Sequence, residues 1–285
     1  MDSQGLRPLS STERFSGAQC FVLSVQKCYF CIGMKKVIFT VLTGNYDHLA
    51  QPEVTDPSYD YICFTERDGQ DGVWQLRRIA FDSPDPITRA RYTKLQPHTA
   101  LQDYDYSVFM DANLCITGHE FYEKVETAID SGALFSGLEH PLRDCVYDEL
   151  RYCFLKEKIG TRAAFRHLRY LKSIGQPRHA GLLETNVLLR AHNDPVVMDL
   201  DNAWWSIFRH CCTRDQLSLP PALFQQGVVP SLLLGKGLNA RNVPFIRYSM
   251  HPRSGSENVP GRIDVANLAY NLRLAWRKFL LLWLK

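Results

Sequence analysis

The middle of the chain contains the run Tyr106-Ser107-Val108-Phe109-Met110-Asp111-Ala112-Asn113. Its first five residues form a short, mostly apolar run that predicts a buried strand, and polar residues end this strand abruptly at Asp111. An extended pattern resumes at residues 114–116. Ligands of α/β sheets bind beyond the carboxyl ends of the strands, which is where this pattern places Asp111. We therefore take Asp111 as the centre of a candidate site.

Strand and helix patterns alternate on both sides of this stretch. β-branched and aromatic runs predict strands at residues 36–42, 59–65, 74–80, 133–138, 186–190 and 243–248. Helical patterns begin near Pro86 and cover residues 120–130, 147–174, 195–208 and 215–224. This alternation predicts an α/β fold with a Rossmann-type, mostly parallel sheet flanked by helices in a single domain.

The composition is that of an ordinary folded protein. The chain has 285 residues, of which 45% are hydrophobic and 22% charged. No linker rich in Pro, Gly or Ser separates Lys36 from Tyr248, so we expect one folded body over residues 36–252, an N-terminal extension over residues 1–35 and a C-terminal tail over residues 253–285. The formal net charge of +3 is too small and dispersed for a nucleic-acid-binding protein, and we expect no nucleic-acid partner.

The nine cysteines indicate a reducing compartment, because their number is odd and several lie in apolar, strand-like runs typical of buried thiols. Cys28 and Cys31 form a lone Cys-x-x-Cys without a second pair at zinc-ribbon spacing, which does not favour a metal or redox role. The apolar run at residues 21–33 is much shorter than the roughly 20 residues that span a bilayer. The expected location is cytoplasmic.

Asp111 and Asn113 have side chains suited to a hard cation. In an extended segment their i, i+2 spacing puts both on one face, where a carboxylate and an amide oxygen can share Mg²⁺ or Mn²⁺. Such a cation would in turn hold a pyrophosphate. The alternative is a structural turn in which Asp111 accepts bonds from backbone N–H groups, and the spacing alone does not separate the two.

Asp111 belongs to a series of short runs that follow one another along the chain. Besides residues 109–113, the runs are Thr43-Gly44-Asn45-Tyr46-Asp47, Tyr61-Ile62-Cys63-Phe64-Thr65, Tyr92-Thr93-Lys94-Leu95-Gln96-Pro97-His98, His140-Pro141-Leu142-Arg143-Asp144-Cys145, Gly181-Leu182-Leu183-Glu184-Thr185-Asn186, Trp204-Trp205 and Arg214-Asp215-Gln216-Leu217-Ser218. In this order they resemble the glycosyltransferase-like family first catalogued as a domain of unknown function, with members in bacteria and among plant mucilage and turgor proteins. The resemblance covers residues 36–251.

The resemblance implies a glycosyltransferase of the GT-A class over residues 36–252. Such an enzyme transfers a sugar from a nucleotide-sugar donor, here expected to be a UDP-sugar, to a glycan or lipid-linked acceptor, as in polysaccharide biosynthesis. It also implies an Asp-x-Asp-type motif for Mn²⁺ or Mg²⁺, in which Asn113 replaces the second carboxylate and weakens the affinity for the metal. His251 stands where many such enzymes place a further metal ligand, and a structural histidine is the alternative.

Three basic residues are expected to contact the donor. Arg91, Lys94 and His98 lie at i, i+3 and i+7, which places them on one helical face unless Pro97 kinks or ends the helix. They match a motif of the family, which implies contact with the donor phosphates. A solvated helix face is the alternative.

Two acidic residues are the expected catalytic residues. Asp215, followed by Gln216, resembles the Asp-Gln element of family-eight transferases, in which the acidic residue lies near the reacting sugar carbon and holds donor hydroxyls; a helix cap is the other role open to Asp215. Glu184 and Asn186 follow Gly181, which lets the backbone approach a ligand, so we expect them to line the sugar or acceptor pocket. A carboxylate there either takes the proton of the acceptor or stabilises charge on the sugar.

A further polar cluster and a pair of tryptophans complete the candidates. His140, Arg143 and Asp144 directly follow a predicted strand, where loops bind ligands, and an Arg–Asp structural pair is the alternative. Trp204 and Trp205 are candidates for stacking on a sugar ring. Adjacent residues of a helix point about 100° apart, so at least one of the two is expected in the core.

The C-terminal tail reads as a basic amphipathic helix. Residues 268–285 mix Leu, Phe and Trp with Arg273, Arg277, Lys278 and Lys285. Such a helix can make a peripheral contact with an anionic membrane, which suits a lipid-linked acceptor. Packing against the body or against another subunit is the alternative.

Two other functions remain open. A metal-assisted hydrolase of a lipid amide or ester would use the same carboxylates to activate water. The chain has no Gly-x-Ser-x-Gly elbow and no His-Glu-x-x-His zinc motif to support this. An inactive nucleotide-sugar-binding protein is suggested by Asn113 in place of an acid.

Overall fold

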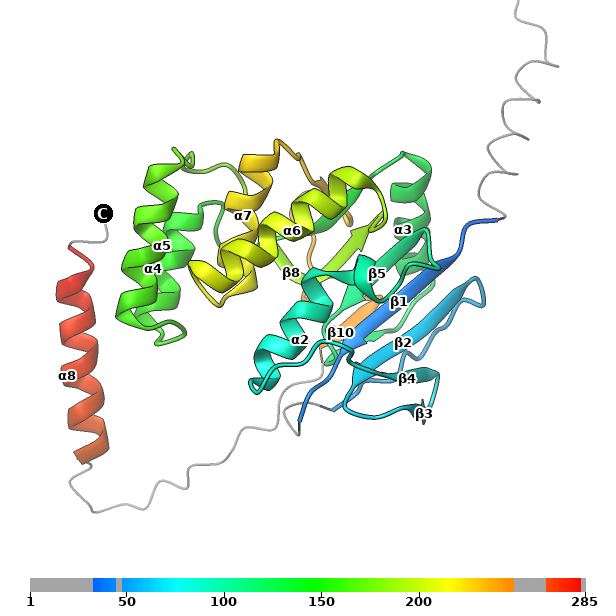
Figure 1. Cartoon of the computed structure of the whole chain (residues 1–285), viewed down its shortest axis with the longest axis horizontal. Helices are drawn as coiled ribbons and strands as arrows, with labels where there is room; N and C mark the ends of the chain where they lie inside the picture. Colours follow the sequence, from blue (N-terminus) through cyan, green and yellow to red (C-terminus); the bar gives the residue numbers. More distant parts are fainter. Residues whose placement is uncertain (1–32, 45–47, 249–264, 283–285) are drawn as a thin grey trace, which may run out of the picture. The chain divides into compact units, whose positions relative to one another are not determined.

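β1 (Lys36–Val41) lies in the middle of an eight-stranded sheet with the order β3-β4-β2-β1-β5-β8-β7-β9 (Figure 1). The structure is a computed structural model, and it describes residues 33–44, 48–248 and 265–282. The chain divides into two units, residues 1–34 and residues 35–285. Every described helix and strand belongs to the second unit.

The first half of the sheet is parallel. β1 pairs with β2 (Tyr59–Thr65) and with β5 (Tyr106–Met110), and β2 pairs with β4 (Trp74–Arg78). The short β3 (Gly69–Asp71) adds an antiparallel edge. β1 and β5 are buried at almost every position, because strands covered on both faces need apolar side chains on both.

The second half of the sheet changes direction at β8 (Leu183–Arg190). β8 lies between β5 and β7 (Phe135–Glu139) and runs antiparallel to both, while β9 (Ser231–Leu232) pairs in parallel with β7. The beginning of β8 therefore meets the ends of β5 and β7 at one edge of the sheet. The backbone N–H of Asp111, directly after β5, donates to the carbonyl of Asn186 at 2.9 Å.

Helices cover both faces of the sheet. The helices on one face are α2 (Pro86–Leu95), α6 (Pro195–His210) and α7 (Asp215–Gln226). Trp204 of α6 is fully buried there, in a core shared with apolar side chains of β1, β5 and β8. On the other face, Glu126 of α3 (Glu120–Asp130) pairs with Lys36 of β1 at 2.5 Å.

The helical region predicted at residues 147–174 forms two helices. α4 (Val146–Leu155) and α5 (Thr161–Ser173) are separated by a turn that contains Glu157 in the left-handed region and by Gly160, the N-cap of α5. Apolar residues of both helices pack into one second core cluster, which explains why the apolar pattern ran on through the turn.

The C-terminal tail contains α8 (Val265–Leu280), a helix that the sequence predicted in this region. Leu280 and Leu281 pack against the cluster formed by α4 and α5, and Arg277 donates to the carbonyl of Ile159 at 3.1 Å. Among the helices of the described ranges, none combines the length and hydropathy needed to cross a membrane.

A small second sheet brings the end of the folded body to Asp111. β6 (Leu114–Ile116) follows the Asp111 turn and pairs antiparallel with β10 (Ile246–Tyr248), so that Tyr248 lies opposite Leu114. The architecture confirms the predicted class, a mixed α/β domain with a large, mostly parallel sheet flanked by helices.

Candidate functional site

Asp111 begins a tight turn at the end of β5. The Leu114 N–H donates to the Asp111 carbonyl at 2.9 Å, so residues 111–113 are not extended, and the argument that i, i+2 spacing puts Asp111 and Asn113 on one face is wrong. The Asp111 side chain is 39% exposed at the sheet edge, whereas Asn113 is buried. Asp111 thus offers an accessible carboxyl oxygen.

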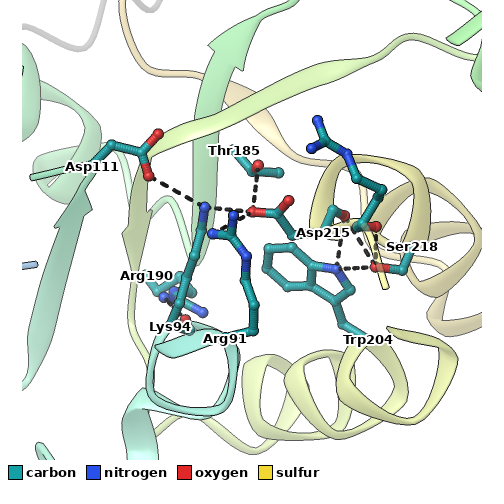
Figure 2. A network of polar contacts seen from close by, with 9 residues as sticks. Arg91, Lys94, Asp111, Thr185, Arg190, Trp204, Asp215 and Ser218 are labelled. Atoms are coloured by element: carbon teal, nitrogen blue, oxygen red, sulfur yellow. Dashed lines mark hydrogen bonds and ion pairs between the residues drawn. The ribbon is translucent and has the colours of Figure 1, made fainter. Parts of the chain in front are cut away.

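Lys94 joins Asp111 to Asp215, as Figure 2 shows. Its Nζ donates to Asp215 Oδ2 at 2.6 Å and lies 3.6 Å from Asp111 Oδ1. Arg91 Nη1 lies 3.2 Å from the same Asp215 oxygen, and the Thr185 hydroxyl donates to it at 3.0 Å. We call Arg91, Lys94, Asp111, Thr185 and Asp215 the Asp215 network.

A fully buried ion pair fixes the position of Lys94. Arg190 of β8 donates to the backbone carbonyl of Lys94 at 2.7 Å, and its Nη1 lies 3.1 Å from Asp201 Oδ1 of α6. Both partners of this pair are inaccessible to solvent. Lys94 is the last residue but one of α2. Arg190 of β8 holds its backbone, and Asp201 of α6 holds Arg190, so the Lys94 side chain is fixed at the sheet edge.

The surrounding charges keep Asp215 ionised. Burial alone raises the pKa of its carboxyl group, but Arg91 and Lys94 outweigh burial and hold this pKa well below its usual range. Burial lowers the pKa of the Lys94 ammonium group, and the neighbouring carboxylates oppose that effect. A carboxylate with so low a pKa is a poor proton acceptor near neutral pH, but it can bind hydroxyl groups and stabilise positive charge.

The backbone of Asp215 is held by Trp204. Asp215 is the first residue of α7, and Arg214 is the N-cap, so a capping role for Asp215 is wrong. The indole N–H of Trp204 lies within hydrogen-bond distance of the Asp215 carbonyl at 3.1 Å and of Ser218 Oγ at 3.0 Å (Figure 2). Trp204 is thus the core member of the tryptophan pair, while Trp205 is only partly buried.

Glu184 and Asn186 lie on the face of β8 opposite to Thr185, as the alternation of a strand requires. Glu184 Oε1 is 2.5 Å from Arg241 Nη1, and Asn186 Nδ2 donates to the Tyr248 hydroxyl at 2.7 Å. These two predicted residues therefore lie at the same sheet edge as Asp111, but they do not contact Asp215.

The sequence analysis did not propose three residues of this region as site residues: Thr185, Arg241 and Tyr248. Thr185 stands between two predicted residues, and strand alternation was the signal that assigns it to the face of Asp215. Arg241 and Tyr248 come from a distant segment, and no local pattern connects them to β8.

His140 and Arg143 follow β7 and form a separate polar group. Arg143 Nε lies 2.5 Å from Glu149 Oε2, whereas Asp144 Oδ1 lies 2.8 Å from His179 Nδ1, so the alternative of an Arg143–Asp144 pair is wrong. His140 Nδ1 accepts from the backbone N–H of Arg143 at 3.0 Å. Burial lowers the pKa of the His140 imidazole.

The remaining predicted residues lie apart from the Asp215 network or outside the described ranges. His98 lies on the 3₁₀ helix η1 (Pro97–Thr99), beyond the end of α2, and so does not share a helical face with the other two basic residues. Gln216 is partly buried on α7. His251 lies outside the described residues.

A group of three metal-binding residue types lies at the start of α4. Ligand atoms of Cys145, Asp148 and His179 are within 4.8 Å of one another. In the part of the chain that the structure describes, no other His, Cys, Asp or Glu residues form such a group. The described residues therefore do not complete a set of this kind around Asp111.

Comparisons with known proteins do not identify the function. No family model and no curated protein matches the chain, so the family resemblance stays a prediction. Among solved structures, the chain is similar to the apo structure of the bifunctional glycosyltransferase WbbM, with a TM-score of 0.40 and 10% sequence identity. The match covers 68% of this chain and 38% of that one, so this chain spans well under half of the length of WbbM.

Proposed function

We propose that the chain is a glycosyltransferase that moves a sugar from a nucleotide-sugar donor, with a UDP-sugar expected, to a glycan or lipid-linked acceptor. The observation that carries the proposal is the Lys94 ammonium group between Asp111 and Asp215, at the ligand-binding edge of a Rossmann-type sheet. A donor bound across this edge meets cations suited to its phosphates and a buried carboxylate suited to its sugar hydroxyls.

In this proposal Asp215 binds and stabilises the donor sugar. Its carboxylate stays ionised because Arg91 and Lys94 are close to it. An ionised carboxylate accepts hydrogen bonds from sugar hydroxyls and stabilises the positive charge that develops at the anomeric carbon as the bond to phosphate breaks. Arg91 is about one-third exposed, and its guanidinium group suits the donor phosphates.

Glu184 is the proposed catalytic base. In the transfer, the acceptor oxygen forms a bond to the anomeric carbon and its proton passes to the Glu184 carboxylate, while the bond from that carbon to phosphate breaks and its electron pair leaves with the nucleoside diphosphate. The nearby Arg241 holds the Glu184 carboxylate in place and balances its charge before the proton arrives.

The other predicted residues are proposed to bind the two substrates. On the donor side these are Arg91, Lys94, His98, Asn113 and Gln216, and on the side of the acceptor or transferred sugar they are His140, Arg143 and Asn186. Asn186 Oδ1 is buried and has no hydrogen-bond partner among the described residues, so a substrate hydroxyl would satisfy it.

A divalent cation, Mn²⁺ or Mg²⁺, is proposed to bind at Asp111. The half-buried Asp111 carboxylate at the sheet edge fits a hard cation, whereas the side chain of Asn113 is buried and less accessible to an ion. Asp111, Asn113 and His251 would hold the ion, which would neutralise charge on the pyrophosphate. Lys94 lies 3.6 Å from the Asp111 carboxylate and already supplies one positive charge there.

A peripheral membrane contact through α8 is a further part of the proposal. Trp276 and Phe279 are exposed and stack on each other, and Leu282 is exposed beyond them. Lys278 and Arg273 supply positive charge beside these apolar side chains. Such a surface suits the boundary between headgroups and acyl chains, where a lipid-linked acceptor would be found.

Release of nucleoside diphosphate from nucleotide-sugars tests the proposed function. The wild-type chain should release it faster with an acceptor present, and Glu184→Gln and Asp215→Asn should not. Nucleotide binding without release would indicate an inactive nucleotide-sugar-binding protein. Hydrolysis of lipid amides or esters by a chain that binds no nucleotide would instead support the hydrolase.

A further inference from the structure

We infer that a pocket beside the Asp215 network binds the aliphatic chain of a lipid-linked acceptor. This inference rests on the proposed function and narrows its acceptor to one class. The pocket has a volume of about 610 Å³, which lies within the range of small-molecule sites. Its walls come from the start of β8, from α7, from the segment after β7 and from the segment that leads into β9.

Two residues that line the pocket are close in sequence to the proposed catalytic residues. Leu183 lines the pocket and directly precedes Glu184 on β8. Leu219 also lines it and follows Asp215 by one turn of α7, which is roughly 6 Å along the helix axis. A molecule whose chain fills the pocket can therefore place its head group near the start of β8, where Glu184 lies.

The lining is aliphatic rather than aromatic. Eight of its residues are Leu or Val, and Phe224 is the single Phe, Tyr or Trp among them. Glycans are usually bound by flat aromatic faces and by many hydrogen-bonding side chains, whereas a hydrocarbon chain needs only apolar surface that can be removed from water. The composition of this wall favours a hydrocarbon chain.

Most polar side chains at the pocket are already engaged by the protein. Arg143 pairs with Glu149, and Asp144 pairs with His179. Glu139 accepts from the backbone N–H of Gly237 at 2.5 Å. Since His140 and Arg143 are proposed to bind one sugar, few polar groups remain for the hydroxyls of a longer glycan.

Gln176 is the exception and marks a polar point inside the pocket. It is only 6% exposed, and its Oε1 has no hydrogen-bond partner among the described residues. A buried acceptor atom without a partner destabilises the folded chain unless a donor reaches it. One hydroxyl or N–H group of the bound lipid would satisfy it.

The position of the pocket favours the acceptor over the donor. Nucleotides bind Rossmann-type sheets beyond the ends of the parallel strands, here β4, β2, β1 and β5. The pocket lies at the β8-β7-β9 end of the sheet instead. Exposed Val229 and Leu142 continue its apolar lining outward to solvent, which gives a long chain a path out of the pocket.

A series of alkyl glucosides tests the inference without knowledge of the natural acceptor. The dissociation constants of methyl, butyl, hexyl and octyl β-glucoside, each below its critical micelle concentration, are measured by calorimetry on the full chain. Each added methylene group should tighten binding by about fourfold while the chain still fits the pocket. Equal affinity across the series overturns the inference.

Pocket variants locate the binding. Val229→Asp at the rim and Leu223→Trp, which fills the pocket, should weaken octyl glucoside binding at least tenfold, with circular dichroism as the check on folding. Val196→Asp, at an exposed valine of α6 outside the pocket, is the matched control and should bind as the wild type does. An equal loss in the control, or no loss in Val229→Asp, overturns the inference.

Nucleotide binding separates this inference from the proposed function. If nucleotides bind but glucoside affinity does not rise with chain length, the acceptor class is wrong and the transferase proposal stands. If no nucleotide binds, the transferase proposal fails. A rise in glucoside affinity with chain length would then mean that the pocket binds a lipid that is not an acceptor, which overturns the inference. Binding of both, with loss only in the pocket variants, supports both.

Discussion

The ammonium group of Lys94 lies 2.6 Å from Asp215 Oδ2, although the two residues are 121 positions apart in the sequence. Both side chains are almost fully buried, so each charge depends on the other for compensation. The same ammonium group lies 3.6 Å from the accessible carboxylate of Asp111. Any ligand that binds Asp111 therefore comes within reach of a charged network built from α2, β8 and α7.

Lys94→Met should strongly destabilise the fold. The change leaves the buried Asp215 carboxylate with Arg91 as its remaining cationic partner in the network, and breaking a buried pair in this way costs about 3–5 kcal/mol of unfolding free energy. Urea unfolding monitored by circular dichroism measures the loss. Lys236→Met, at an exposed position, is the control, and a loss below about 1 kcal/mol in Lys94→Met would contradict a buried ion pair.

Asp111→Asn should remove turnover and leave the fold intact. The Asp111 side chain is 39% exposed and serves the proposed ligand rather than the core, so the unfolding free energy should change by no more than about 0.5 kcal/mol. Asp103→Asn, also on the surface, is the matched control for loss of one negative charge. A cooperative unfolding midpoint far below that of the control would mean that Asp111 has a structural role.

Glu184→Gln should lower the turnover number by about two to four orders of magnitude, the usual contribution of a general base. The amide keeps a hydrogen bond to Arg241 but does not take up a proton at neutral pH. Affinity for the nucleotide should change less than about twofold, since Glu184 is proposed to act on the acceptor. Steady-state kinetics with equilibrium nucleotide binding separates the two effects, and a loss confined to nucleotide affinity would place Glu184 on the donor side.

Two buried histidines should make the fold sensitive to acid. His167 and His192 are inaccessible to solvent, and burial lowers the pKa of each to about 4. In both, Nε2 bonds a backbone carbonyl, while Nδ1 has no hydrogen-bond partner among the described residues. Protonation would thus bury an uncompensated N–H donor.

The sign of this effect follows from proton uptake. The unfolded chain binds protons at histidine below about pH 6.5, whereas the folded chain binds them only near pH 4. Between these values the unfolding free energy should fall with falling pH by about 1.4 kcal/mol per pH unit for each histidine. Urea unfolding across this range should show a shallower slope in His192→Gln than in the wild type, and no change in the exposed-site control His210→Gln. Equal slopes in the wild type and His192→Gln would contradict a neutral, buried His192.

Much of the fold could be predicted from apolar runs. β1, β2 and β5 were found because strands covered on both faces need continuous apolar sequence. The direction of β8 was not predictable, since an apolar run has the same appearance in a parallel and an antiparallel strand. That direction is what brings Glu184 and Asn186 to Asp111.

The site was predictable at the level of residue types rather than contacts. Lys94, Asp111 and Asp215 were all proposed, yet the ion pairs among them depend on how α2 and α7 pack. An extended segment was expected at residues 111–113 and a turn was the alternative, and the structure has the turn. The sequence did not separate the two, because Asp-x-Asn fits both equally well. The alternative of an Arg143–Asp144 pair was wrong, since Arg143 pairs with Glu149 on the following helix.

Thermal unfolding of the purified chain with UDP, GDP, CMP, ADP and UDP-sugars, each with and without Mn²⁺, tests the central claim most directly. A ligand present at about a hundredfold over its dissociation constant adds roughly 2.7 kcal/mol to the unfolding free energy and raises the melting temperature measurably. We expect such a rise with one nucleotide, larger with Mn²⁺ and reduced in Asp111→Asn. An unchanged melting temperature with every nucleotide would contradict it.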